Sequence, residues 1–176
     1  MPRRMNWGCG QVIAHGWINS DIVAGEGVDI RCDILQGFPL EDDYLDYISS
    51  QHGLQDLRIY DQIPAMKELR RVLKPRGVLR LALPDFDRAI DSYRAGRQDH
   101  FLVRDWDTLS GNFITHVLWH NLTQTLFTYS FAEELLKKAG FDLVRQVGFR
   151  ETLSNHAEIV ELDARKDESF FLEAVK

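Results

Sequence analysis

Short runs of alternating apolar and polar residues, separated by turn-forming residues, dominate the first half of the chain. Alternation of this kind is typical of β-strands. Five runs predict strands: Arg4–Trp7, Trp17–Asp21, Val28–Cys32, Leu45–Ser50 and Gly77–Leu83.

A helical spacing interrupts this pattern before the fifth run. Apolar residues recur every three or four positions from Ile59 to Leu73. Pro64 suits the first turn of a helix, and Pro75 ends it. A second helix is expected at Phe86–Ala95.

The second half of the chain predicts one clear helix and two closing strands. The helix is Phe131–Ala139, where Ser130 and Glu133 have the spacing of a capping box and Gly140 follows the last turn. The sequences FDLVRQVGF and SFFLEAV suit strands, and residues 150–169 are expected to be irregular. Strands that alternate with helices predict an α/β fold with a mostly parallel sheet.

Charge and cysteine content narrow the class of protein. A formal net charge of −6 over 176 residues argues against nucleic-acid partners and acidic membranes. The sequence shows no pattern typical of a signal peptide and no apolar run near the ~18 residues of a membrane span, so we expect neither a leader nor a membrane span. Cys9 and Cys32 lack a metal-ligand spacing, so we expect no metal site. These features together favour a single cytoplasmic domain.

The stretch Met5–Asp21 holds the strongest candidate chemistry. It is interpreted as a strand, a Gly-x-Gly turn at Gly8 and Gly10, a second strand and a carboxylate. Glycines allow a ligand to lie against the main chain. Asp21 at a strand end can accept two hydrogen bonds from a ribose diol. Asp33, after the next strand, is a candidate for an adenine amino group, or simply a turn residue. Asp56, after the fourth strand, is a weaker candidate among the acids at strand ends.

A nicotinamide dinucleotide is the main rival ligand. Its G-x-G-x-x-G fingerprint needs a third glycine, and Ile13 stands there instead. Residues 11–16 hold at most one helical turn, so the usual helix aimed at a pyrophosphate is missing. A phosphate-free nucleoside needs no such helix, which favours S-adenosylmethionine over NAD.

The chain resembles the class I S-adenosylmethionine-dependent methyltransferases, in particular small bacterial members of the methyltransferase-11-like group. The matching pieces are NWGCG, GWINSDI, VDIRCDI, FPLEDDYLDYISSQHGLQDL, ELRRVLKPRGVLRLALPDF and LLKKAGFDLV. The resemblance implies a Rossmann-like, doubly wound α/β fold with a mostly parallel seven-stranded sheet whose last strand is reversed. It implies a cofactor-binding half at residues 1–95, a cover for the acceptor site at 97–130, and a closing helix and strands at 131–176.

The resemblance also implies cofactor-binding residues. These lie in the glycine turn, at the ends of the second and third strands and after the fourth strand: Asn6, Gly8, Cys9, Gly10, Asp21, Ile22, Asp33, Ile34, Ser50, Gln51 and His52. Two positions depart from the family pattern. Asn6 stands where an acid often helps to hold the methionine ammonium, and Gln51–Leu57 stands where relatives tend to read like HVLEHL.

A hydroxyl acceptor would need a general base, and histidine suits that work near neutral pH. His116 and His120 would share one face if Phe113–Leu122 is helical, and they lie among aromatic residues in the acceptor cover. One interpretation is an aromatic acceptor pocket with either histidine as the base. The alternative is an amphipathic helix that packs on the sheet. Asp85 is a further candidate base and equally a helix cap.

The expected function is therefore methyl transfer from S-adenosylmethionine to oxygen or nitrogen of a small-molecule acceptor, such as a glycan or secondary-metabolite precursor. A non-catalytic scaffold that serves a protein partner is the alternative, motivated by the two departures. A nucleotide-dependent oxidoreductase is disfavoured. The identity of the acceptor stays open, and exposed aromatic residues fit a homodimer contact as well as a substrate pocket.

Overall fold

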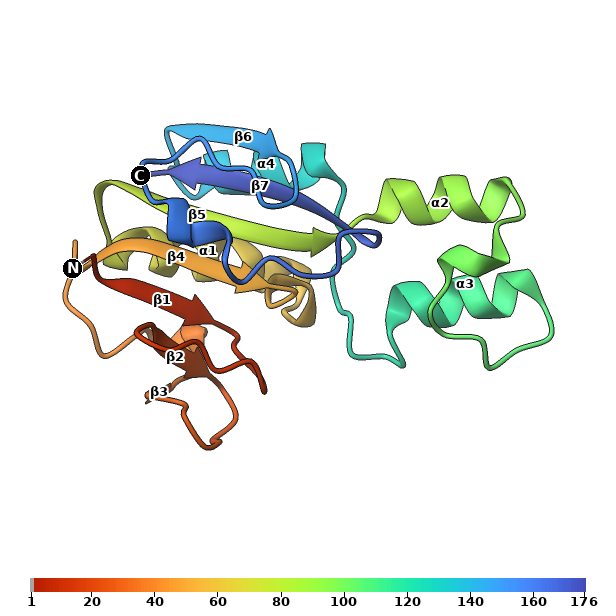
Figure 1. Cartoon of the computed structure of the whole chain (residues 1–176), viewed down its shortest axis with the longest axis horizontal. Coiled ribbons are helices and arrows are strands. Elements are labelled where there is room, and N and C mark those ends of the chain that lie inside the picture. The colour runs from red at the N-terminus through yellow and green to blue at the C-terminus, as the bar shows by residue number, and fades with distance from the viewer. Residues whose placement is uncertain (1) are drawn as a thin grey trace.

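The computed structural model describes residues 2–176 and contains a seven-stranded sheet with the order β3-β2-β1-β4-β5-β7-β6 (Figure 1). The first five strands along the chain pair in parallel, and β7 runs antiparallel to both of its neighbours. The strands are β1 Arg4–Trp7, β2 Ile18–Asp21, β3 Ile30–Arg31, β4 Leu45–Gln51, β5 Leu73–Pro84, β6 Leu143–Val147 and β7 Ser169–Val175. The predicted fold class is confirmed, including the reversed last strand.

Two helices cover one face of the sheet. Helix α1 (Gln62–Val72) connects β4 to β5, and α4 (Tyr129–Lys138) precedes β6 (Figure 1). Their apolar faces meet the central strands in the main core, where Met5, Met66 and Leu136 are fully buried. Burial of these alternating strand positions and helical stripes fixes the register of the sheet.

An irregular segment covers the opposite face. Residues 148–168, which we call the strap, contain the short 3-10 helix η5 (Ala157–Val160). Ile159 of the strap packs into a second apolar cluster with Trp17 and Tyr47. The predicted irregular stretch at 150–169 thus forms one side of the folded core.

Two further helices extend beyond the carboxyl ends of the parallel strands (Figure 1). Helix α2 (Phe86–Arg94) follows β5 directly, and Asp85 caps it by accepting a hydrogen bond from the Arg88 N–H at 3.0 Å. Helix α3 (Leu109–Leu118) begins at its own cap, Thr108. This pair positions side chains over the end of the sheet where ligands bind in open α/β folds.

Several local predictions need correction. Thr128, and not Ser130, caps α4, because its hydroxyl accepts from the Phe131 N–H at 3.3 Å. Strand β5 begins at Leu73, where it already pairs with Leu45. Residues 11–16 contain no helix, which agrees with the expectation of at most one helical turn there. Within residues 2–176, no helix combines the length and apolar character needed to cross a membrane.

Candidate functional site

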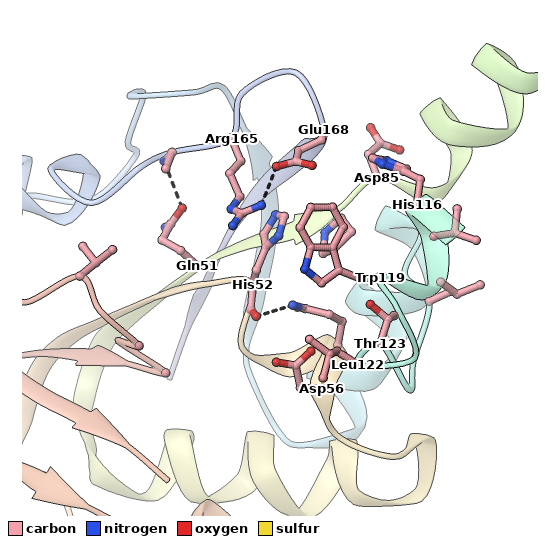
Figure 2. Close-up of a pocket in the computed structure, with 18 of the residues that line it drawn as sticks. Gln51, His52, Asp56, Asp85, His116, Trp119, Leu122, Thr123, Arg165 and Glu168 are labelled. Carbon is pink, nitrogen blue, oxygen red and sulfur yellow. Dashed lines mark hydrogen bonds and ion pairs between the residues drawn. The ribbon is translucent and has the colours of Figure 1, made fainter. Parts of the chain in front are cut away.

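A cavity of about 510 Å³ lies at the carboxyl ends of β1, β4 and β5. Four parts of the chain line it: the turn after β1, the segment after β4, the helices α2 and α3 with the loop that follows α3, and the end of the strap (Figure 2). A cavity of this size is in the range of small-molecule and cofactor sites.

The turn after β1 presents bare backbone to this cavity. Gly8 and Gly10 have positive φ values of 66° and 51°, which glycine adopts without strain. The Gly8 N–H donates to the Ser20 carbonyl at 2.8 Å and fixes the turn to β2. A Cβ at Gly10 would meet no atom within 4 Å, so the space beside this residue is open.

Asn6 holds the far side of the same turn. Its side chain is almost completely buried, at 3% exposure. The amide nitrogen donates to the Val12 carbonyl at 2.7 Å and to the Asn19 side-chain oxygen at 3.1 Å. A carboxylate at this position could not donate either hydrogen bond. The Asn6 amide therefore stabilises the turn in a way that an acid could not.

The residues at the ends of β2 and β3 that were expected to bind a nucleoside are not among those that line the cavity. The Asp21 carboxylate accepts from the Gly10 N–H at 2.8 Å and from the Val23 N–H at 2.9 Å. Asp33 caps the short 3-10 helix η1 (Ile34–Gln36) and accepts from the Leu35 N–H at 3.0 Å. Ile34 is buried and Ile22 is exposed. Both carboxylates therefore order the loops at the tips of β2 and β3.

Three of the predicted residues follow β4, and two of them reach the cavity. The Ser50 side chain is buried, whereas Gln51 and His52 line the cavity. His52 has a positive φ of 57°, and its Nε2 lies 2.7 Å from the Ser169 hydroxyl. Burial lowers the pKa of His52 to about 3, with a further contribution from the charge of Arg165. The imidazole is therefore uncharged near neutral pH.

Two further cavity residues follow His52 closely in the chain: Gln55, which the sequence analysis did not single out, and Asp56, the weaker candidate after the fourth strand. Gln55 donates from its amide nitrogen to the His52 carbonyl, while its oxygen is buried without a hydrogen-bond partner in residues 2–176. Asp56 lies at the cavity rim, where desolvation, and then the charge of Asp21, raise its pKa to about 6. Their place at the end of a parallel strand was the available signal.

His116 and His120, the two candidate bases, do not share a helical face. Helix α3 ends at Leu118, and three consecutive residues from Trp119 to Asn121 have positive φ values of 43°, 55° and 70°. His116 lines the cavity, whereas His120 is exposed and is not among the lining residues. The left-handed turn brings Trp119 into the cavity wall instead (Figure 2).

Aromatic rings surround the His116 imidazole. Its ring centroid lies 5.7 Å from that of His100, 5.4 Å from Phe101 and 6.3 Å from Trp119. Burial lowers the pKa of His116 to about 4, and the nearby His100 adds to this effect. Its Nδ1 is buried and no hydrogen-bond partner for it exists in the described part of the chain. An uncharged imidazole therefore lines the cavity.

Two ion pairs also border the cavity. The Arg165 guanidinium donates to the Glu168 carboxylate at 2.9 Å (Figure 2) and lies 5.7 Å from the Trp119 ring centroid. Asp85 lies 3.5 Å from Arg88 while it caps α2. Across residues 2–176, no group of three His, Cys, Asp or Glu side chains is arranged to hold a metal ion.

Comparisons with known proteins agree with this architecture. Residues 14–81 match the family model described as a methyltransferase domain. An S-adenosylmethionine-dependent methyltransferase from Archaeoglobus fulgidus superposes with a TM-score of 0.63 at 12% identity, covering 99% of this chain and 86% of that one. The chain has the class I methyltransferase fold. No curated protein matches it by sequence.

Other solved methyltransferases show the same fold at low identity. A possible histamine N-methyltransferase from Thermotoga maritima superposes with a TM-score of 0.57 at 16% identity, covering 100% of this chain and 83% of that one. Phosphoethanolamine N-methyltransferase 2 from Haemonchus contortus, in complex with S-adenosyl-L-methionine, gives 0.60 at 17%, with 99% of this chain and 48% of that chain covered. The resemblance to class I methyltransferases that the sequence predicted is confirmed.

Proposed function

We propose that this protein binds S-adenosylmethionine and transfers its methyl group to a small-molecule acceptor. The observation that carries the proposal is the bare glycine turn at one wall of a cavity of about 510 Å³, in a methyltransferase fold. Residues 11–16 contain no helix, which suits a nucleoside without a pyrophosphate better than a dinucleotide.

In this proposal the glycine turn and the strand ends hold the cofactor. Gly8, Cys9 and Gly10 lie against its methionine and ribose portion, with Asn6 beneath them. Asp21 accepts from the ribose hydroxyls, and Asp33 with the Ile34 backbone meets the adenine edge. What supports this is that the Asp21 carboxylate lies 2.8 Å from the Gly10 nitrogen, beside the turn, and has lone pairs to spare. Ile22, Ser50, Gln51 and His52 complete the proposed set.

The opposite wall of the cavity is the proposed acceptor site. When bound, the cofactor supplies a sulfonium leaving group for in-line displacement, and the protein's work is alignment and exclusion of water. His116 is the proposed base, because its uncharged imidazole lines the cavity. The exposed position of His120 supports no such role. A cytoplasmic location and a homodimer stay predictions from the sequence.

Calorimetric titration with S-adenosylmethionine, S-adenosylhomocysteine and NAD tests this function. We expect saturable one-to-one binding of both sulfur compounds and none of NAD. Binding of neither sulfur compound would contradict the proposal and leave the non-catalytic scaffold. Preferential binding of NAD would restore the oxidoreductase alternative. Methyl transfer is then measured as the formation of S-adenosylhomocysteine with added acceptors.

A further inference from the structure

The cavity wall opposite the glycine turn is mainly apolar and aromatic. Helix α2, helix α3 and the loop after α3 provide it (Figure 2). Its apolar members include Phe86, Ala89, Val117, Trp119, Leu122 and Leu126. A flat aromatic molecule gains contact area and ring–ring interactions against such a wall.

The chain itself pairs the charged groups on this side. Among the described residues, Arg165 forms an ion pair only with the carboxylate of Glu168, whose side chain is mostly buried at 12% exposure. The Asp85 carboxylate is taken up by the α2 cap and by Arg88. A phosphate or carboxylate on the acceptor would have to displace Glu168 or remain unpaired, and both carry a large desolvation cost.

The one lone charge at the cavity is negative. Asp56 lies at its rim, and no Lys, Arg or His of residues 2–176 lies within ion-pair distance of it. This carboxylate repels an anionic acceptor. On the proposed function it faces a cofactor whose sulfonium and ammonium groups are positive, which leaves no uncompensated charge for the acceptor to match.

The His116 imidazole is a hydrogen-bond acceptor within the aromatic part of the wall, where the Trp119 indole can only donate. The His116 imidazole lies beside Phe101 and Trp119; its Nδ1 is enclosed and has no partner among the residues described, so a molecule in the cavity would meet the ring on its Nε2 side. An uncharged imidazole can accept one hydrogen bond at a defined point. An acceptor N–H or O–H directed at this ring would be fixed while the rest of the molecule rests on apolar side chains.

We infer that the acceptor is an uncharged aromatic molecule without phosphate or carboxylate groups, whose N–H or O–H donates to the His116 imidazole. This inference rests on the proposed function, because it assigns the cavity wall that faces the methyl donor. The inferred acceptor class is thus distinct from phosphorylated amines and from zwitterionic amines.

A set of ligands with one common ring tests the inference. Phenol, aniline, benzylamine and phenyl phosphate are titrated at pH 7.5 into protein saturated with S-adenosylmethionine, which keeps the sulfonium charge beside Asp56, and binding is followed by ligand-detected NMR. We expect phenol and aniline to bind at least about tenfold more tightly than phenyl phosphate or the benzylammonium cation. The inference would be overturned if either charged ligand bound most tightly. It would also be overturned if none of the four bound at a ligand concentration of about 10 mM, which is roughly the weakest Kd that the assay detects.

The variant Glu168→Gln gives a gain-of-binding test of the charge argument. It frees Arg165 while it keeps the size of the side chain, so phenyl phosphate should bind up to about fivefold more tightly and phenol should not change. Glu133→Gln, which breaks an exposed pair with Lys137 on α4, is the matched control. Unchanged phenyl phosphate affinity in Glu168→Gln would contradict the masking role of Glu168.

The two proposals fail in different ways. If S-adenosylhomocysteine itself does not bind, the proposed function is wrong before any acceptor is added. If it binds and the charged rings are preferred, the methyltransferase function stands and the acceptor class is wrong. Loss of the preference for phenol in His116→Phe, with S-adenosylhomocysteine affinity retained, is the expected signature of the hydrogen bond.

Discussion

Arg80 and Asp163 form a two-pronged ion pair in which both side chains are completely buried. Arg80 Nε lies 2.7 Å from Asp163 Oδ1, and its Nη2 lies 2.5 Å from Oδ2. The remaining hydrogens of the guanidinium reach Glu173 of β7 and the Gly148 and Glu151 carbonyls of the strap. A single residue of the central strand β5 thus ties the strap, which lines the cavity, to the sheet.

The first prediction concerns this buried pair. Asp163→Asn removes one charge and leaves the guanidinium incompletely paired, so the free energy of unfolding should fall by about 3–5 kcal/mol in urea titrations. Lys138→Ala breaks an exposed pair with Glu134 and should cost no more than about 0.5 kcal/mol. Equal losses in the two variants would show that the buried pair does not anchor the strap.

The second prediction concerns the pH dependence of stability. The native pKa of His52 is about 3, whereas an unfolded histidine titrates near 6.5. Below pH 6.5 this histidine is therefore protonated in the unfolded chain but not in the folded chain. The free energy of unfolding falls as the pH falls toward 3. From pH 7 to pH 5 this residue alone should remove about 2 kcal/mol from the free energy of unfolding.

His52→Gln should remove that part of the pH dependence while His15→Gln, a substitution of an exposed histidine, should not. Urea unfolding of the three proteins at pH 7 and pH 5 provides the measurement. If wild type and His52→Gln lose the same stability over this interval, the native imidazole is not held in its uncharged form by burial.

The strands were predictable because their signal is local. Alternation and turn residues identify β1 and β4 almost to the residue, and the spacing of apolar residues identifies α1. Strand β3 is shorter than predicted because it lies at the edge of the sheet and, within residues 2–176, pairs with β2 alone, through two residue pairs. Strand β5 begins early because Leu73 pairs with Leu45, a contact that periodicity does not encode.

The candidate site was only partly predictable for the same reason. Gly8, Gly10 and Asp21 belong to one short stretch of sequence, and the structure brings them together. Arg165 and Glu168 lie in a charged stretch that resembles a solvated loop, and only the folding of the strap over the sheet brings them to the cavity. The expected histidine face assumed a helix continuing past Leu118, where a left-handed turn instead ends it.

The third prediction separates backbone strain from ligand contact at two glycines. Gly10 and Gly96 both have positive φ, at 51° and 70°, and a Cβ at either would meet no atom within 4 Å. Alanine at each position should therefore cost about 1 kcal/mol of stability through strain alone. Only Gly10→Ala should also weaken S-adenosylhomocysteine binding, because only Gly10 lines the cavity.

Thermal unfolding and calorimetry of the two alanine variants check this. A similar loss of stability with an affinity loss confined to Gly10→Ala is the expected pattern. An equal affinity loss in Gly96→Ala would attribute the effect to general destabilisation, and unchanged affinity in both would remove the glycine turn from the cofactor site.

The fourth prediction concerns the carboxylate next to the glycine turn. Asp21→Ala removes the acceptor of two backbone N–H groups, and since the residue is only partly buried, water can replace those bonds at small cost. If the carboxylate also accepts from a ribose diol, S-adenosylhomocysteine affinity should fall by about 1.5–3 kcal/mol, or roughly ten- to a hundredfold. Asp87→Ala removes the same charge from an exposed position in the first turn of α2 and should leave the affinity unchanged. Retained affinity in Asp21→Ala, measured by calorimetry at equal ionic strength, would show that this carboxylate serves the turn alone and that the ribose is held elsewhere.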